Sequence, residues 1–253
     1  MNPTVSIITP SYNAGRFIGK AIQSVLAQTF ADWEMIIVDD CSTDDSLKII
    51  RSFDDPRIKS ASLDGNSGAG IARNTALQIA SGRYIAFLDA DDFWKPEKLE
   101  KQLKFMQSQK IPFTFSYYDC VDESENSLNR IVKAPKILTY RQLFFCNFVG
   151  NLTGIYDSAE FGKIQINSVR KRQDWILWLT IVKRIKKAPV LPEVLASYRI
   201  RKDSISASKK SLLRHNYRIY RDFHQLSPLA SLACMIGFLF TQLIIKPRYI
   251  RRK

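Results

Sequence analysis

The chain has 253 residues, of which 45% are hydrophobic and 11% aromatic, and a formal net charge of +14. This length suits one large domain, or one domain with a small appendage, and the apolar content excludes a disordered chain. Residues 1–125 have a net charge of −5 and residues 126–253 a net charge of +19. The two halves are therefore expected to do different jobs. The basic half should attract an anion: nucleic acid, a membrane surface or a diphosphate.

The cysteines and histidines exclude several classes of site. Four scattered cysteines without CxxC spacing indicate reduced thiols, as in a cytosolic protein, rather than a disulfide frame or a zinc site. Two histidines argue against a His-based zinc site and a Ser-His-Asp triad. The sequence also lacks the lysine motif of P-loop NTPases. No signal peptide precedes the first apolar run, so a cytosolic location is expected.

The first half alternates between strand-like and helix-like patterns, which is typical of a largely parallel sheet flanked by helices. Strands are predicted at residues 5–9, 33–38, 58–63 and 84–88. Helices are predicted at 17–26, around 47–50, near 70–80 and at 96–107. Beyond residue 125 the pattern is less regular, with a helix at 174–182, an extended run at 190–198 and a polar loop at 199–208.

Polar clusters follow three of these strands: 10–13, 39–40 and 89–92. Because ligands bind outside the carboxyl ends of strands in an open parallel sheet, the three clusters should converge on one crevice. Crowded carboxylates at Asp89, Asp91 and Asp92 repel one another unless a cation compensates, and such oxygen ligands suit Mg²⁺ or Mn²⁺. The alternative is a solvated acidic turn that caps the next helix. The position directly after a buried strand favours the metal-binding interpretation.

Three further features each have a structural and a functional interpretation. Asp39 and Asp40 suit either a helix cap or hydrogen bonds to a base or ribose. Arg73 follows a polar loop that lacks GxGxxG spacing, and it suits a phosphate or carboxylate partner. Asp174 precedes an aromatic helix within a basic region. It suits either the cap of that helix or a general base for a hydroxyl nucleophile.

Taken together, the motifs resemble the signature of family 2 glycosyltransferases. The segments that carry the resemblance are 5–13, 38–44, 66–68, 72–74 and 88–92, and they match in order and spacing over residues 1–110. The resemblance implies an α/β protein with a GT-A fold, which is Rossmann-like, with a mostly parallel central sheet and flanking helices. It also implies a nucleotide-sugar donor and inversion at the anomeric carbon.

The resemblance also implies residue roles. Asp89 and Asp91 form a DxD motif that contacts the ribose and a Mn²⁺ or Mg²⁺ ion, with Asp92 sharing this role. Asp174 is the expected base, although the family's preceding Glu is replaced by Gln173. Residues 198–206 resemble a diphosphate-binding YRxHxxSxS segment in which arginine replaces histidine. The residues expected at the nucleotide sugar are Pro10, Tyr12, Asn13, Asp39, Asp40, Arg73, Asp89, Arg199, Arg201 and Ser204.

A narrower resemblance extends over nearly the whole chain. Segments 134–135, 139–141, 150–156 and 174–179 are similar to enterobacterial O-antigen transferases that add β-1,3-linked glucose to GlcNAc-diphosphoundecaprenol. This similarity implies UDP-glucose as donor and a lipid-linked acceptor, with UDP-galactose or another acceptor as the alternative. A non-catalytic basic protein that binds a membrane or nucleic acid is the alternative of another class. Acidic clusters that repel phosphate without a metal argue against nucleic acid.

The domain boundaries follow from these resemblances. Residues 1–210 are expected to form the catalytic domain, with a donor half at 1–110 and an acceptor half at 111–210. Residues 211–253 are expected to form a basic, amphipathic helical tail on the cytoplasmic face of the bacterial inner membrane, as in a peripheral protein. The apolar run 229–245 is slightly shorter than the roughly 20 residues of a spanning helix. A helix lying in the interface is therefore favoured over a packed or a spanning one.

Overall fold

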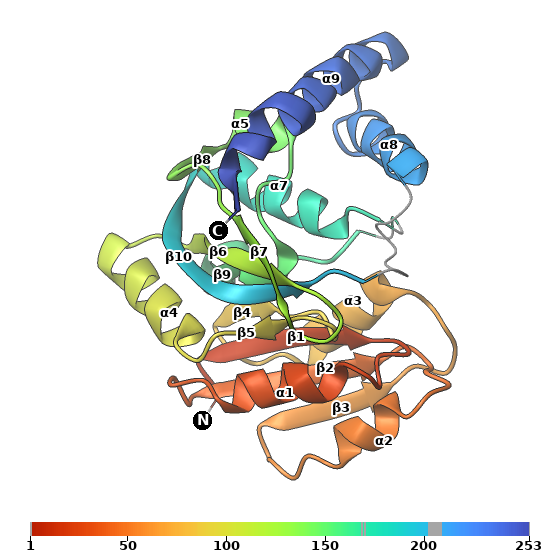
Figure 1. Ribbon diagram of the computed structural model, residues 1–253, viewed down its shortest axis with the longest axis vertical. Coiled ribbons are helices and arrows are strands. Elements are labelled where there is room, and N and C mark those ends of the chain that lie inside the picture. Colours follow the sequence, from red (N-terminus) through yellow and green to blue (C-terminus); the bar gives the residue numbers. More distant parts are fainter. Residues whose placement is uncertain (1, 168, 170, 202–208, 253) are drawn as a thin grey trace.

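The computed structural model describes residues 2–252 except 168, 170 and 202–208. Its centre is a mixed sheet with the strand order β11-β7-β6-β9-β4-β1-β2-β3, flanked by helices (Figure 1). Successive side chains of a strand point to opposite faces, and β1 shows this alternation. Ile7 packs with helices α1 and α4, whereas Ile8 packs with α3 and α7. The sheet therefore lies between two helical layers.

The donor half has the predicted alternation. Its strands are β1 (Val5–Ser11), β2 (Trp33–Asp39), β3 (Ile58–Ser62) and β4 (Tyr84–Phe87), all parallel in the order β3-β2-β1-β4. Its helices are α1 (Ile18–Leu26), α2 (Ser46–Arg51), α3 (Ala69–Ile79) and α4 (Lys98–Gln109). The carboxyl ends of β1, β2 and β4 therefore lie at one edge, as expected.

The acceptor half extends the sheet with mixed directions. Its strands are β6 (Phe113–Val121), β7 (Ser127–Val132), β8 (Ile137–Thr139), β9 (Ile155–Asp157) and β10 (Lys187–Arg199), and the short β5 (Phe93–Trp94) of the donor half pairs with β10. Its helices are α5 (Tyr140–Phe145), η1 (Asn151–Thr153), α6 (Ser158–Phe161) and α7 (Gln173–Ile185). β9 runs antiparallel to β4, and the curved β10 pairs with β8, β6 and β5 in turn (Figure 1). β10 therefore carries its last residues to the acidic turn after β4.

The last segment begins with α8 (Lys209–Arg218) and η2 (Ile219–Phe223). α9 (Pro228–Phe240) starts at a Ser227 cap and continues through η3 (Thr241–Ile245) and η4 (Lys246–Tyr249). Residues Pro228–Tyr249 thus form one helical run of 22 residues, longer than the sequence indicated. By length and composition it could cross a membrane. β11 (Ile250–Arg252) then pairs with β7, so the described chain ends in the central sheet.

Candidate active site

The first two polar clusters contact each other at the edge of the sheet. The backbone amide of Asp40 donates to the carbonyl of Ser11 (2.8 Å), which joins the ends of β1 and β2. Asn13 lies in the left-handed region (φ 46°), its amide donates to Ser42 Oγ (2.9 Å), and its Oδ1 accepts from the Thr43 amide (2.9 Å). Asn13 therefore holds the turn after β1 against the turn after β2.

Asp39 and Asp40 are both buried and both accept backbone hydrogen bonds. Asp39 accepts from the amide and the hydroxyl of Ser42 (2.8 and 2.6 Å), which closes the turn into α2. Asp40 accepts from the amides of Ser67 (2.7 Å) and Gly68 (2.8 Å), at the start of α3. Tyr12 is 49% exposed beside them. This edge therefore combines fixed carboxylates with an accessible aromatic ring, a suitable surface for a nucleoside.

Asp89 is fixed from two directions. Its carboxylate accepts from Arg73 Nη2 (2.5 Å) and from Asn151 Nδ2 (3.0 and 3.1 Å). Arg73 also donates from Nη1 to Gln173 Oε1 (2.7 Å), at the first residue of α7. Gly70 permits this approach, since a Cβ there would lie 2.4 Å from Gln173 Nε2. Arg73 therefore joins the acidic turn to the helix that carries Asp174.

Asp91 and Asp92 have different surroundings. Asp91 is partly exposed and pairs with Arg201 Nη1 (3.1 Å). Asp92 is only 2% exposed, and its Oδ1 accepts from the Arg199 amide (2.9 Å). Burial, together with neighbouring aspartates, raises the pKa of both carboxyls. The described residues contain no group of three or more His, Cys, Asp or Glu side chains arranged to hold a metal ion. Asp92 thus holds the Arg199 backbone beside the acidic turn. Its expected share in metal binding stays a prediction.

Arg199 is 3% exposed, and its guanidinium is engaged with the protein. Nε donates to the carbonyl of Asp91 (2.9 Å), Nη1 to that of Glu123 (3.0 Å), and Nη2 pairs with Glu125 (3.2 Å). The guanidinium also lies over the ring of Phe17 (5.0 Å). These contacts fix the turn around the acidic cluster. The diphosphate contact that the resemblance implies for Arg199 stays a prediction. Ser204 lies outside the described residues.

Asp174 lies in the first turn of α7 and faces the same space as Asp89. Its Oδ2 accepts from Asn147 Nδ2 (2.7 Å). Burial raises the pKa of Asp174, while the nearby charge of Arg172 opposes this shift. A carboxylate with a raised pKa is a better proton acceptor near neutral pH than an ordinary one. The sequence did not indicate a role for either asparagine. Asn147 is uncharged and outside the recognised segments, and Asn151 lies in segment 150–156 but received no role from the resemblance.

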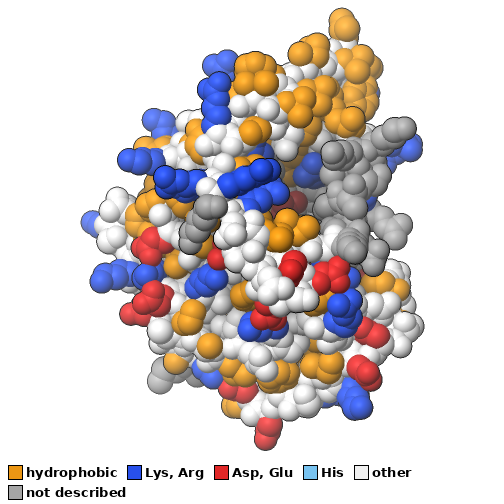
Figure 2. All heavy atoms as spheres, in the orientation of Figure 1, with side chains coloured by type: hydrophobic (Ala, Val, Ile, Leu, Met, Phe, Trp, Pro, Cys, Tyr) orange, Lys and Arg blue, Asp and Glu red, His pale blue; other side chains and the backbone are white. Residues whose placement is uncertain are grey.

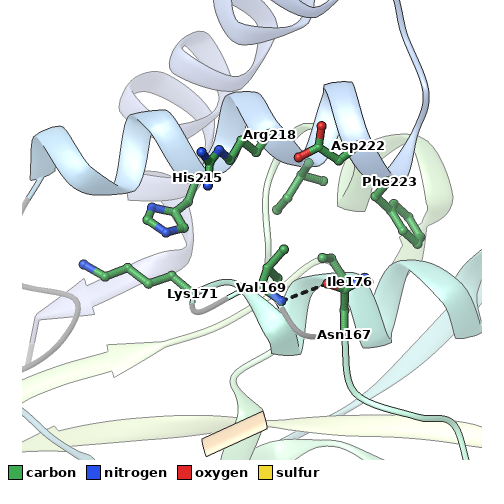
Figure 3. A pocket seen from close by; sticks show the side chains of 9 residues that line it. Asn167, Val169, Lys171, Ile176, His215, Arg218, Asp222 and Phe223 are labelled. Carbon is green, nitrogen blue, oxygen red and sulfur yellow. Dashed lines mark hydrogen bonds between the residues drawn. The ribbon is translucent and has the colours of Figure 1, made fainter. Parts of the chain in front are cut away.

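One cavity of about 410 Å³ brings the two halves together. Asp89, Asp92, Arg73 and Asp174 all line it, although they are far apart in the chain. A smaller cavity of about 140 Å³ lies between the start of α7 and α8 (Figure 3). Lys171 lines both cavities. The larger cavity therefore contains the predicted donor-side carboxylate and the predicted base.

A parallel αβ sheet with an acidic turn at its carboxyl edge, facing a buried carboxylate, defines an enzyme of the nucleotide-sugar-dependent transferase class. Residues 6–155 match the family model described as Glycosyl transferase family 2. Since this match covers more than half of the chain, the protein belongs to that family and is a glycosyltransferase. The expected family and fold are confirmed.

The chain is similar along most of its length to two characterised or assigned relatives. TuaG of Bacillus subtilis (strain 168), a glycosyltransferase provisionally assigned to teichuronic acid biosynthesis, is 41% identical, with 93% of this chain and 94% of TuaG covered. WfgD of Escherichia coli, a UDP-Glc:α-D-GlcNAc-diphosphoundecaprenol β-1,3-glucosyltransferase, is 37% identical, with 93% and 92% covered. Both similarities extend beyond the donor half into the acceptor half.

A solved structure shares the fold at low sequence identity. The crystal structure of S. aureus TarS 1–349 with UDP-GlcNAc superimposes with a TM-score of 0.72 at 21% identity. The match covers 96% of this chain and 73% of that one. The likeness therefore includes the acceptor half and the C-terminal segment as well as the donor half.

Proposed function

We propose that the protein transfers glucose from UDP-glucose, with inversion, to the GlcNAc of a diphospholipid-linked acceptor and forms a β-1,3 linkage. The observation that carries this proposal is the placement of Asp174 across one cavity from Asp89. The similarity to WfgD over both halves supports the choice of donor, acceptor and linkage. Assembly of a bacterial surface polysaccharide, such as an O-antigen, is the corresponding role.

In this reaction the acceptor hydroxyl attacks the anomeric carbon opposite the departing UDP, and Asp174 accepts the proton of that hydroxyl. Asn147 orients the carboxylate through the hydrogen bond to Oδ2. Arg73 holds Asp89 and the start of α7 together, which fixes the distance between the two halves. The exposed Tyr12 and the loop anchored by Asp40 are the proposed nucleoside surface, and Pro10 is buried near the end of β1, two residues before Tyr12.

A divalent cation fits the donor side. Asp89 and Asp91 are partly exposed carboxylates on one turn, and Mg²⁺ or Mn²⁺ is commonly bound by one or two carboxylates plus substrate phosphates. When bound, the ion would neutralise the charge that develops on the leaving diphosphate. Arg201, which pairs with Asp91, is placed to donate to the same phosphates.

A panel of UDP-sugars tests the reaction. The purified chain, with Mn²⁺ or Mg²⁺, is supplied with each sugar nucleotide and a synthetic GlcNAc-α-diphosphate-alkyl acceptor, and the product linkage is read by NMR. Fastest transfer from UDP-glucose, with a β-1,3 product, is expected. Preferred transfer from UDP-galactose would change the donor, and absence of transfer from every UDP-sugar would reject the proposal.

We also propose that α9 lies in the cytoplasmic surface of the inner membrane. Within the helical run Pro228–Tyr249, which begins with α9, only 17% of the apolar 18-residue stretch is buried, and Figure 2 shows apolar side chains gathered over this end of the molecule. The most exposed of them are Leu229 (78%) and Ile236 (71%). Both ends of the helical run lead into the folded domain. Tyr220, which precedes the run, is buried, and β11, which follows the run, pairs with β7. A spanning orientation would detach one of these ends, so an interfacial helix is favoured.

Vesicle sedimentation tests this membrane contact. The double variant Ile236→Asp/Leu243→Asp places charges on the exposed apolar face, and it is expected to lose at least tenfold in affinity for anionic vesicles, since each buried apolar side chain contributes about 1.5–3 kcal/mol. Leu128→Asp is the control, because Leu128 is exposed on β7. Equal binding by the double variant and the wild type would reject the proposal.

A further inference from the structure

The large cavity is lined by charged groups of both signs. Asp89 and Asp92 contribute carboxylates to its lining, whereas Lys171, Arg172 and Lys246 contribute cations. The donor chemistry proposed above uses none of these three cations. They come from separate segments: Lys171 and Arg172 precede α7, and Lys246 begins η4, directly after the exposed apolar helix. A cavity wall built from two segments and carrying three positive charges indicates an anion-binding function.

Lys246 is connected to the proposed base through one residue. Its Nζ donates to the carbonyl of Asn147 (2.8 Å), and the side-chain amide of Asn147 donates to Asp174 (2.7 Å). Cys146, which precedes Asn147, also contacts the C-terminal helical run, because its Sγ lies 3.2 Å from Gln242 Oε1 of η3. The C-terminal segment therefore forms part of the active-site wall next to the base.

Arg172 contributes a second cation to the lining of this cavity. It adopts a left-handed conformation (φ 69°) directly before α7, and its Nε donates to the buried Asn216 of α8 (2.8 Å). Burial raises the pKa of the Cys146 thiol, and the charges of Lys246 and Arg172 both oppose that shift. Both cations therefore lie near Cys146, although they are far apart in sequence. Figure 3 shows the adjacent Lys171 opposite His215 of α8.

We propose that Lys171, Arg172 and Lys246 form a binding site for the diphosphate of the lipid-linked acceptor, separate from the site for the donor diphosphate. This inference rests on the proposed function. In a GlcNAc-diphosphate acceptor, the diphosphate and the reacting hydroxyl are attached to the same sugar ring. The diphosphate must therefore bind within one ring of the base, where the chain of contacts from Lys246 through Asn147 to Asp174 lies.

The place of Lys246 in the fold also accounts for the lipid. It follows α9 and η3, whose exposed apolar side chains include Leu243 and Ile244. A diphosphate held by Lys246 would leave its prenyl chain at the end of the apolar helix. Charge-assisted hydrogen bonds from lysine and arginine to phosphate are roughly twice as strong as neutral ones. Lys171, Arg172 and Lys246 therefore select acceptors that carry an anionic group next to the reacting sugar.

Kinetics with two soluble acceptors test the site. The first is GlcNAc-α-diphosphate with a short alkyl chain, and the second is the same alkyl GlcNAc without phosphate. Lys246→Ala and Lys171→Ala are each expected to lower kcat/KM for the diphosphate acceptor about tenfold, which corresponds to roughly 1.4 kcal/mol. Lys171→Ala should leave kcat/KM for the phosphate-free acceptor unchanged, whereas Lys246→Ala, which also removes the bond to Asn147, should lower it less than it lowers kcat/KM for the diphosphate acceptor. Neither variant should change KM for UDP-glucose. Arg248→Ala is the control, because it removes an exposed charge two residues from Lys246 and outside the cavity.

Three results would overturn the inference. The first is a rise in KM for UDP-glucose in Lys246→Ala, which would assign the cations to the donor. The second is an equal loss with both acceptors, which would mean a merely structural role. The third is an equal loss in Arg248→Ala, which would reflect general surface charge.

A binding measurement separates failure of this site from failure of the proposed reaction. If no UDP-sugar is transferred, calorimetry of geranyl diphosphate is carried out on the full chain with saturating UDP and Mn²⁺. Binding to the wild type that weakens about tenfold in Lys246→Ala, but not in Arg248→Ala, would support the diphosphate site independently of glucosyl transfer. Absence of binding to the wild type, or equal binding by the wild type and Lys246→Ala, would reject the site itself.

Discussion

The donor and acceptor halves hold their carboxylates in different ways. Asp39 and Asp40 accept hydrogen bonds from backbone amides in nearby turns, whereas Asp174 is held by the side chain of Asn147. The loop that carries Asn147 is in turn bonded to the C-terminal segment through Lys246. The part of the donor half around Asp39 and Asp40 is therefore preorganised by its own turns, whereas Asp89 is held by the side chains of Arg73 and Asn151. The acceptor site depends on side chains from several distant elements and on the position of the C-terminal segment.

The comparison predicts its largest effect at Asp174. Asp174→Asn keeps the shape of the side chain but removes its ability to accept a proton, so kcat should fall about 10³-fold, within the range typical of a lost general base. Asp174 is proposed to act on the acceptor hydroxyl, so affinity for UDP with Mn²⁺, measured by calorimetry, should stay within about twofold of the wild type. A twofold change is well under one kcal/mol, which corresponds to about fivefold. Asp222→Asn, which changes an exposed carboxylate of η2, is the control. A fully active Asp174→Asn variant would exclude Asp174 as the base.

On the donor side, Asp91→Ala should weaken the binding of UDP with Mn²⁺, in addition to any effect on the rate of transfer. Asp91 is partly exposed, and its carboxylate pairs only with Arg201 among the ion pairs of the described residues. We expect a loss of about 100-fold in Mn²⁺-dependent UDP affinity, close to 2.7 kcal/mol, and little change in UDP affinity without metal. Titration calorimetry with and without Mn²⁺ measures both. The exposed Asp54→Ala serves as the control. Unchanged Mn²⁺-dependent affinity would contradict metal binding by Asp91.

The same contrast explains how much the sequence could predict. The four parallel strands and their helices follow from local apolar periodicity, and the convergence of Asn13, Asp40 and Asp89 follows from the rule for strand ends. The bonds of Asn147 and Asn151 depend on a loop whose place is set by packing against α7 and the C-terminal run. No local pattern encodes that packing. Likewise, the return of β11 to β7 is a long-range pairing of three residues, too short to leave a periodic signal.

The donor half also contains a buried lysine that should lower the stability of the fold, and the apolar periodicity of its helix does not reveal it. Lys98 is fully buried over the ring of Trp94 (3.9 Å), and its Nζ has no hydrogen-bond partner among the described residues. Burial lowers the pKa of Lys98 to about 7. Lys98→Met should raise the free energy of unfolding at pH 7 by about 2 kcal/mol, because it removes an unsatisfied buried donor. Denaturant titration measures this change, with the exposed Lys104→Met on the same helix as control.

The pH dependence of this stability has a definite sign. The pKa of Lys98 is lower in the folded chain than its ordinary value of 10.5, so the unfolded chain binds more protons between about pH 7 and that value. The free energy of unfolding of the wild type should therefore rise with pH between about 7 and 10.5. Below about pH 7, the destabilisation by the buried charged Lys98 is present in full. Lys98→Met should lack the rise, so the two proteins should become more alike at high pH. A constant difference from pH 6 to 10 would contradict this account.

The smallest expected effect compares two asparagines on one loop. Asn147 donates to Asp174, whereas Asn151 donates to Asp89. A hydrogen bond to the charged form of an acid lowers its pKa, so Asn147→Ala should raise the pKa of Asp174 beyond the shift that burial already causes. The acid limb of kcat/KM for the acceptor should then move to higher pH, with a loss of about fivefold at neutral pH.

Asn151→Ala provides the matched comparison for this limb. It removes a bond to the donor-side carboxylate, so it should raise KM for UDP-glucose and leave the acid limb in place. Profiles of kcat/KM against pH, taken at saturating donor, separate the two variants because only one alters the environment of the base. An equal shift of the limb in both would mean that the halves titrate as one network through Arg73, which bonds both Asp89 and Gln173. The donor and acceptor carboxylates would then lie at separate places in the cavity but would influence each other's pKa.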